Sequence, residues 1–188
     1  MGIWQLHIEN RLLACVAHVD VRWGNAVFRV FLLRSSLQVD LAFWPESEFG
    51  ATGETFRLIS GTAHDRPRPP AQEPTQLIGM AWLYALHVRS SIARARLWQA
   101  EFMLSGMRDQ VLALACVRHG LNPRDARGVD DLPPEVTSPL LPTLVCRLDA
   151  DELRRAFSAV TAALLDETRH VNPALAERLS PTLALLND

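Results

Sequence analysis

The chain has 188 residues, of which 48% are hydrophobic, and a formal net charge of −2. This length allows one ordinary hydrophobic core, or two small ones that share an interface. The nearly balanced charge creates no global field that would attract nucleic acid or an anionic membrane, so neither is expected as a partner.

All 19 basic residues are arginine, which with the richness in alanine, leucine and proline suggests a bacterial genome of high GC content. Any side-chain cation that contacts a phosphate here must therefore be a guanidinium. The cysteines Cys15, Cys116 and Cys146 are far apart and show no CxxC spacing, which fits a reducing cytoplasm. Charged residues interrupt the apolar start, so no signal peptide is expected. The longest uncharged stretch, 74–88, is short of the roughly 20 residues that cross a bilayer.

The first third of the chain predicts a β-hairpin after an ambiguous start. Residues 7–19, "HIENRLLACVAHV", fit an amphipathic helix. The β-branched and aromatic runs within 26–44, broken at Ser35 and Ser36, predict two antiparallel strands, and Pro45 ends the second.

Asp40 lies within the apolar run "LQVDLAFW", which predicts a buried strand. A buried carboxylate without a partner is costly, so Asp40 should have either a partner or a function. One interpretation is an ion pair with Arg29 or Arg34 on the neighbouring strand. The other is a ligand for Mg²⁺, a hard cation that prefers carboxylate oxygens and substrate phosphates.

The rest of the chain predicts a linker and then helices only. Prolines and glycines are frequent from Pro45 to residue 74, and helical periodicity follows at about 75–89, 91–119 and 149–171. Asp149 and Glu152 have the spacing of a cap pair at the start of the last of these helices. Shorter helical segments are expected near Ser138-Pro139 and after Asn172-Pro173. We therefore expect an α+β protein, with a small β-containing domain over 1–72 and a helical bundle over 73–188.

The predicted helix 91–119 carries a narrow polar stripe on an otherwise apolar surface. The stripe contains Arg94, Glu101, Ser105, Arg108 and Asp109. It fits either a face that lines a cleft or a solvated ladder of local ion pairs, and spacing alone favours the ladder. The chain has no P-loop, GxGxxG, GxSxG or HExxH motif.

Three segments together resemble bacterial nucleotidyltransferase-domain proteins, the relatives of aminoglycoside adenylyltransferases. They are "VFRVFLLRSSLQVDLAFWPESEFGATGETFRLISG", "WLYALHVRSSIARARLWQAEFMLSGMRDQVLALACVRHGL" and "ARGVDDLPPEV", and the resemblance runs from about residue 22 to the C-terminus. It implies a small mixed sheet followed by a helical bundle. It also implies magnesium-dependent transfer of a nucleotidyl group from an NTP to a small-molecule hydroxyl.

The resemblance assigns roles to four residues. Asp40 matches the third of three carboxylates that hold magnesium in this family, and so is both a metal ligand and a catalytic residue. Glu101 resembles the carboxylate of the helical domain that acts as general base. Arg94 and Arg108 would bind substrate at the cleft.

The sequence also departs from this family. No Gly-Ser turn followed by an Asp-x-Asp pair precedes Asp40, and only Asp20 lies in the region before it. Two of the three metal carboxylates are therefore missing, as if the chain were truncated or its metal centre lost, and we expect little or no turnover. An alternative function is a non-catalytic module that binds small molecules or protein and forms a homodimer through an open sheet edge. A toxin–antitoxin component ranks last, because no Arg-x₄₋₆-His signature follows Arg108.

Overall fold

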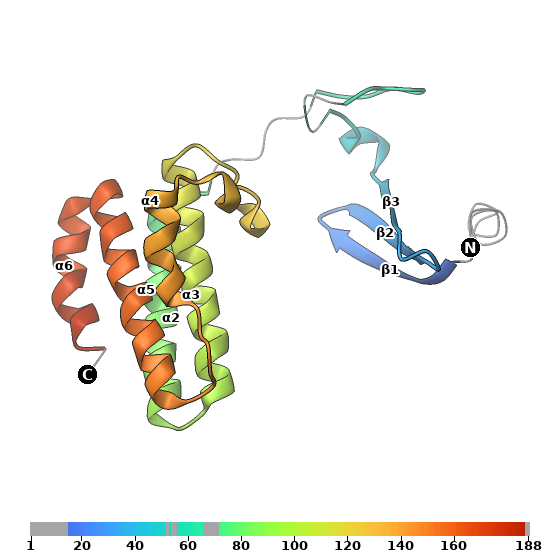
Figure 1. The fold of residues 1–188 in the computed structure, drawn as a ribbon. Coiled ribbons are helices and arrows are strands. Elements are labelled where there is room, and N and C mark those ends of the chain that lie inside the picture. Colours follow the sequence, from blue (N-terminus) through green and yellow to red (C-terminus); the bar gives the residue numbers. More distant parts are fainter. Residues whose placement is uncertain (1–14, 52, 54–55, 66–71, 187–188) are drawn as a thin grey trace. The chain divides into compact units, whose positions relative to one another are not determined.

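The computed structural model describes residues 15–186, apart from 52, 54–55 and 66–71. The chain divides into two compact units, unit 1 over 1–69 and unit 2 over 70–188, and each is described by itself. Unit 1 contains a small antiparallel sheet and unit 2 contains helices (Figure 1), which confirms the expected α+β class. Within the described residues, no helix combines the length and apolar character that crossing a bilayer requires.

Unit 1 is built on three antiparallel strands in the order β1-β2-β3. Their bounds are Cys15–Trp23, Ala26–Leu33 and Gln38–Phe43. The expected hairpin over 26–44 is confirmed, with Ser36 in the left-handed region at the turn. The described part of the ambiguous start is strand rather than helix, and the rest of it lies outside the described residues. Alternation of Val19, Val21 and Trp23 before a Gly-Asn turn explains this strand, because apolar residues at every second position place their side chains on one face of a sheet.

The two faces of the sheet differ in burial. Phe31 and Leu33 on one face are buried, at 2% and 5% exposure. Val19, Val21 and Leu32 on the other face remain about half exposed. Unit 1 therefore presents apolar side chains on the surface of its sheet.

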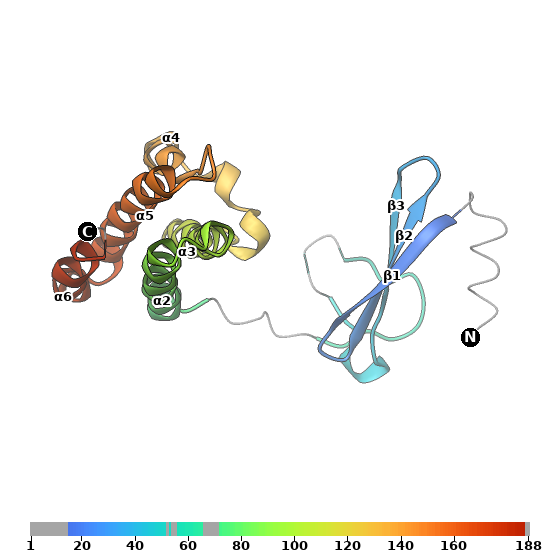
Figure 2. The same ribbon diagram turned by 90° about the horizontal axis from the view of Figure 1, so that it is seen from below.

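The helices of unit 2 follow the predicted order, with one boundary corrected. The bounds are α2 Pro74–Ala93, α3 Leu97–Arg118, α4 Pro134–Thr137, α5 Ala150–Val171 and α6 Pro173–Ala184. The break between the first two long helices falls at residues 94–96, several residues later than expected. Packing extends α2, since Ser91 and Ile92 are buried, and Ala95 makes the turn with a φ of 53°. Figure 2 shows α2 and α3 side by side, nearly end-on.

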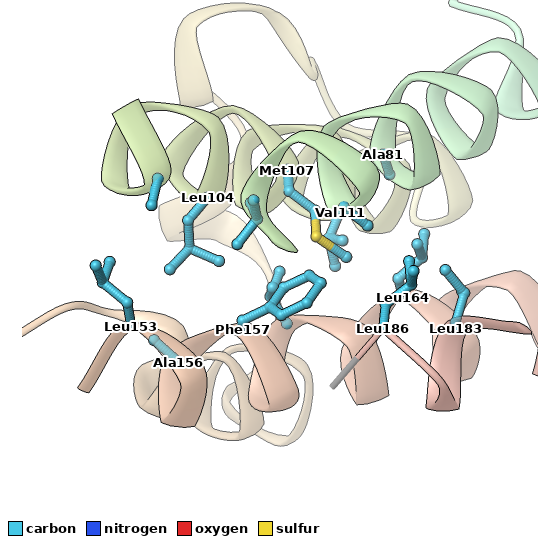
Figure 3. Close-up of a cluster of buried hydrophobic side chains, with 14 of the residues drawn as sticks. Ala81, Leu104, Met107, Val111, Leu153, Ala156, Phe157, Leu164, Leu183 and Leu186 are labelled. Atoms are coloured by element: carbon cyan, nitrogen blue, oxygen red, sulfur yellow. The ribbon is translucent and has the colours of Figure 1, made fainter. Parts of the chain in front are cut away.

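The core of unit 2 lies between α5 and the pair α2 and α3. Leu104, Met107 and Val111 of α3 face Phe157 and Leu164 of α5 (Figure 3), and all five are at most 2% exposed. Burying each such side chain contributes about 1.5–3 kcal/mol, so this layer accounts for much of the stability of the bundle.

Helices α2 and α3 pack closely where Gly106 meets Tyr84. A Cβ atom on Gly106 would lie 3.0 Å from Cζ and 3.1 Å from Cε1 of the Tyr84 ring. Glycine at this position thus allows the ring to lie against the α3 backbone.

The segment between α3 and α5 consists of short helical turns. These are the 3-10 helices η2 Arg124–Ala126, η3 Val129–Asp131 and η4 Ser138–Thr143, together with α4. The short helix expected at Ser138-Pro139 is thus confirmed as η4. Asp149 begins α5 by accepting a hydrogen bond from the backbone N–H of Glu152, as the spacing predicted.

Glu152 and Arg155 attach this segment to α5. Arg155 donates to both carboxylate oxygens of Glu152 and to the carbonyl oxygens of Pro142 and Leu144, all within 2.9 Å. The backbone N–H of Cys146 donates to Glu152 as well. The hydrogen bonds from Arg155 and then from Cys146 lower the pKa of Glu152 to about 2.

Candidate functional site

Asp40 lies in the middle of β3, with its side chain exposed rather than buried as expected. The difference arises because β3 is a sheet edge within the described residues and its Asp40 face is open to solvent. The Nε2 group of Gln38, which shares that face, lies 2.9 Å from both carboxylate oxygens of Asp40. The carboxylate is accessible to a ligand and already has a donor beside it.

The proposed ion pair between Asp40 and Arg29 is wrong. Arg29 lies opposite Leu41, whereas Asp40 lies opposite Val30, so the two side chains leave opposite faces of the sheet. Arg29 instead makes a bidentate pair with Asp20 of β1, with both distances at 2.6 Å. The hydrogen bond from Arg29 is the main reason that the pKa of Asp20 lies below its usual value.

This register also decides how well unit 1 fits a magnesium centre. Asp20 and Asp40 lie on opposite faces of the sheet, so they cannot share one metal ion. In the part of the chain that the structure describes, no group of three or more His, Cys, Asp or Glu side chains is placed to hold a metal. The described residues therefore do not fit the carboxylate cluster that the resemblance implies.

Glu101 and Arg108 both lie on α3, in the polar stripe that the sequence predicted. Arg108 donates to the hydroxyl of Ser105 at 2.7 Å and to the carbonyl oxygen of Thr143 at 3.2 Å, which joins α3 to η4. Glu101 is half-buried, and its carboxylate makes no hydrogen bond to the other described residues. The local ladder therefore forms only at its Ser105–Arg108 end.

Arg94 does not belong to the stripe, because it lies in the turn before α3 begins. It lines one pocket, while Arg108 lines a different one with Leu112 and Asp130. Asp40 lies in unit 1 and Glu101 lies in unit 2. The catalytic roles of Asp40 and Glu101 and the substrate-binding roles of Arg94 and Arg108 remain predictions.

The pocket that contains Arg94 also contains two arginines that were not predicted from the sequence as site residues, Arg89 and Arg154. Arg89 comes from the end of α2, Arg94 directly follows that helix, and Arg154 comes from the second turn of α5. The arginine-rich wording "HVRSSIARAR" was a usable signal for the first two. Arg154 is 60 residues further along the chain than Arg94, so only the fold brings it to them.

Comparison with solved structures finds similarity to the crystal structure of an aminoglycoside 6-adenyltransferase from Bacillus subtilis. The TM-score is 0.51 at 15% sequence identity, and the match covers 98% of this chain and 82% of that chain. No protein-family model matches the sequence, and no curated protein does so either. At this identity the likeness shows the fold alone: the chain has a nucleotidyltransferase-like fold.

Proposed function

We propose that this chain is a nucleotidyltransferase-like protein that transfers little or no nucleotide by itself. The activity class is proposed from the fold, which resembles that of an aminoglycoside 6-adenyltransferase. One observation supports the proposed low turnover: Asp20 and Asp40 lie on opposite faces of the sheet. Transfer of this kind needs divalent cations to neutralise charge on the phosphates, and one carboxylate holds such an ion poorly.

In a complete centre, the chain would bind an NTP and a small-molecule hydroxyl acceptor. Asp40 would be a metal ligand, Glu101 would accept the hydroxyl proton, and Arg94 and Arg108 would contact substrate. The free thiols of Cys15, Cys116 and Cys146 support a reducing compartment, and we propose the cytoplasm.

The test is an assay of AMP transfer from labelled ATP, with magnesium and a panel of aminocyclitol acceptors. We expect no transfer above the background of a protein-free reaction. Robust transfer that disappears in Asp40→Asn would show that Asp40 belongs to a complete metal centre and would refute the proposed low turnover.

A second candidate function is a non-catalytic binding module that dimerises through its sheet. The observation that favours it is the apolar face of unit 1, where Val21 of β1 is 49% exposed and Leu32 of β2 is also 49% exposed. Strand β1 forms an edge of the sheet within the described residues, and an unpaired edge is a template for pairing with another chain. A second copy would cover both the edge and its apolar neighbours.

Native mass spectrometry at micromolar concentration tests this candidate. We expect a dimer that Val21→Lys converts to monomer, because a lysine on an edge strand opposes pairing. Ile59→Lys is the matched control, since Ile59 is 94% exposed and lies outside the sheet. A wild-type monomer, or equal loss of dimer in both variants, would rule the candidate out.

A further inference from the structure

Unit 2 contains a pocket at the end where α2 passes into α3. Its cavity of about 480 Å³ lies within the range typical of small-molecule sites. Leu86, Arg89, Ser90 and Ala93 line it from one face of α2, at i, i+3, i+4 and i+7 spacing. Arg94 follows in the turn after α2. The chain enters the helical bundle at the Pro74 end of α2, and the pocket lies at the opposite end of that helix (Figure 1).

Charge distinguishes this pocket. Arg89, Arg94 and Arg154 line it, and within the described residues no carboxylate does. Each of three other pockets of unit 2 contains at least one carboxylate, such as Asp109 or Asp130. The arginine pocket, as we call it, is therefore suited to an anion.

The arginines of the pocket are available to bind an anion. Neither Arg89 nor Arg94 forms an ion pair with another described residue. Arg154 pairs with Asp151 at 2.9 Å, but the Asp151 side chain is 94% exposed, and a pair this exposed is weak and readily exchanged. The C-terminal dipole of α2 favours cations at Arg89 and Arg94, but it offers no reason for Arg154 of α5 to join them.

The other wall of the pocket is apolar. Ile92, Phe157 and Leu186 line it and are at most 9% exposed, so their positions are set by the core of the bundle (Figure 3 shows Phe157 and Leu186). Leu86 adds a more exposed apolar contact at 43%. A ligand that fills this pocket should therefore combine a multiply charged anionic group with an apolar body.

We propose that the arginine pocket binds a diphosphate ester with an apolar body, such as a nucleoside diphosphate. A diphosphate carries about three negative charges near neutral pH, which three guanidinium groups balance, and each guanidinium can donate two parallel hydrogen bonds to phosphate oxygens. The apolar wall takes the base. The proposal depends on this pocket alone and holds whether or not the chain transfers a nucleotidyl group.

Isothermal titration of the full chain with inorganic pyrophosphate and with ADP tests the proposal, at physiological salt and without divalent cations. We expect both to bind, with ADP tighter because only ADP reaches the apolar wall. In Arg89→Gln/Arg94→Gln, binding of both should weaken by about tenfold or more, as expected for loss of charge-assisted hydrogen bonds. Arg178→Gln on α6 is the matched control, an exposed arginine outside the pocket, and should bind like wild type.

A second measurement uses the wild-type chain, so that it does not depend on variants folding. Arginines are modified with phenylglyoxal and mapped by mass spectrometry, with and without pyrophosphate. Pyrophosphate should protect Arg89, Arg94 and Arg154, but not Arg178. Absence of binding at about 10 mM pyrophosphate and ADP, a Kd weaker than any useful site, would overturn the proposal. So would equal loss of binding in the control variant, or equal protection of all four arginines. Equal affinity for pyrophosphate and ADP would refute the apolar part of the site.

Discussion

The contact between Gly106 and Tyr84 predicts that Gly106→Ala destabilises the protein when the Tyr84 ring is present and stabilises it when the ring is removed. Gly106→Ala adds a Cβ atom that would lie 3.0–3.3 Å from three atoms of the Tyr84 ring. Contacts this short force the ring or the helices to shift, at a cost of about 1–3 kcal/mol. Alanine also favours the helix over glycine by about 1 kcal/mol. The net result should be a loss of about 1 kcal/mol in the free energy of unfolding.

Removing the ring should leave only the helical preference. In a Tyr84→Ala background, Gly106→Ala should therefore raise the free energy of unfolding by about 1 kcal/mol, a coupling of about 2 kcal/mol between the two positions. Urea denaturation followed by far-UV circular dichroism measures this, since the long helices of unit 2 dominate the signal. A coupling near zero, or a stabilising Gly106→Ala in the wild-type background, would refute the packing argument for α2 and α3.

Two further predictions concern the segment between α3 and α5. Because the pKa of Glu152 is lowered to about 2, its contribution to stability is present above its ordinary pKa near 4.5 and is lost as the pH falls toward 2. Glu152→Gln should therefore lower the urea midpoint of unfolding at pH 5. It should also make the midpoint fall less steeply than in wild type between pH 5 and pH 3. A fall as steep as that of wild type would contradict the stabilising role of the pair with Arg155. Gly128→Ala places a Cβ atom 2.7 Å from the carbonyl oxygen of Asn122 and 2.8 Å from the Cβ atom of Leu121. It should reduce the free energy of unfolding by about 2 kcal/mol or more, and a loss below about 0.5 kcal/mol would show that this loop adapts freely.

The sequence predicted those parts of the fold that depend on local pattern. The β-branched and aromatic runs on either side of Ser35 and Ser36 were enough for the hairpin, and the spacing of Asp149 and Glu152 was enough for the start of α5. The turn at Ala95 could not be predicted in this way, because alanine carries no turn signal and packing of Ile92 decides how far α2 extends. The strand before the Gly-Asn turn had a recognisable signature that the helical interpretation of residues 7–19 overlooked.

The candidate site was predictable to a lesser extent, because it depends on register and on distant parts of the chain. The sequence places Arg29 and Asp40 on adjacent strands, but only the pairing with Leu41 shows that Arg29 lies on the opposite face. A shift of one residue in that pairing would have reversed the result. Likewise, Arg154 joins the arginine pocket only through the packing of α5 against α2.

The hydrogen bonds of Arg155 and Glu152 have a consequence for how unit 2 opens. The stretch from Leu144 to Leu148 has no regular secondary structure, so by appearance its amides should exchange with solvent like those of any surface loop. The amide of Cys146, however, donates to the carboxylate of Glu152, which Arg155 also holds, and so it exchanges only when that hydrogen bond opens. Its deuterium uptake should therefore be slower than that of a loop amide exposed to solvent.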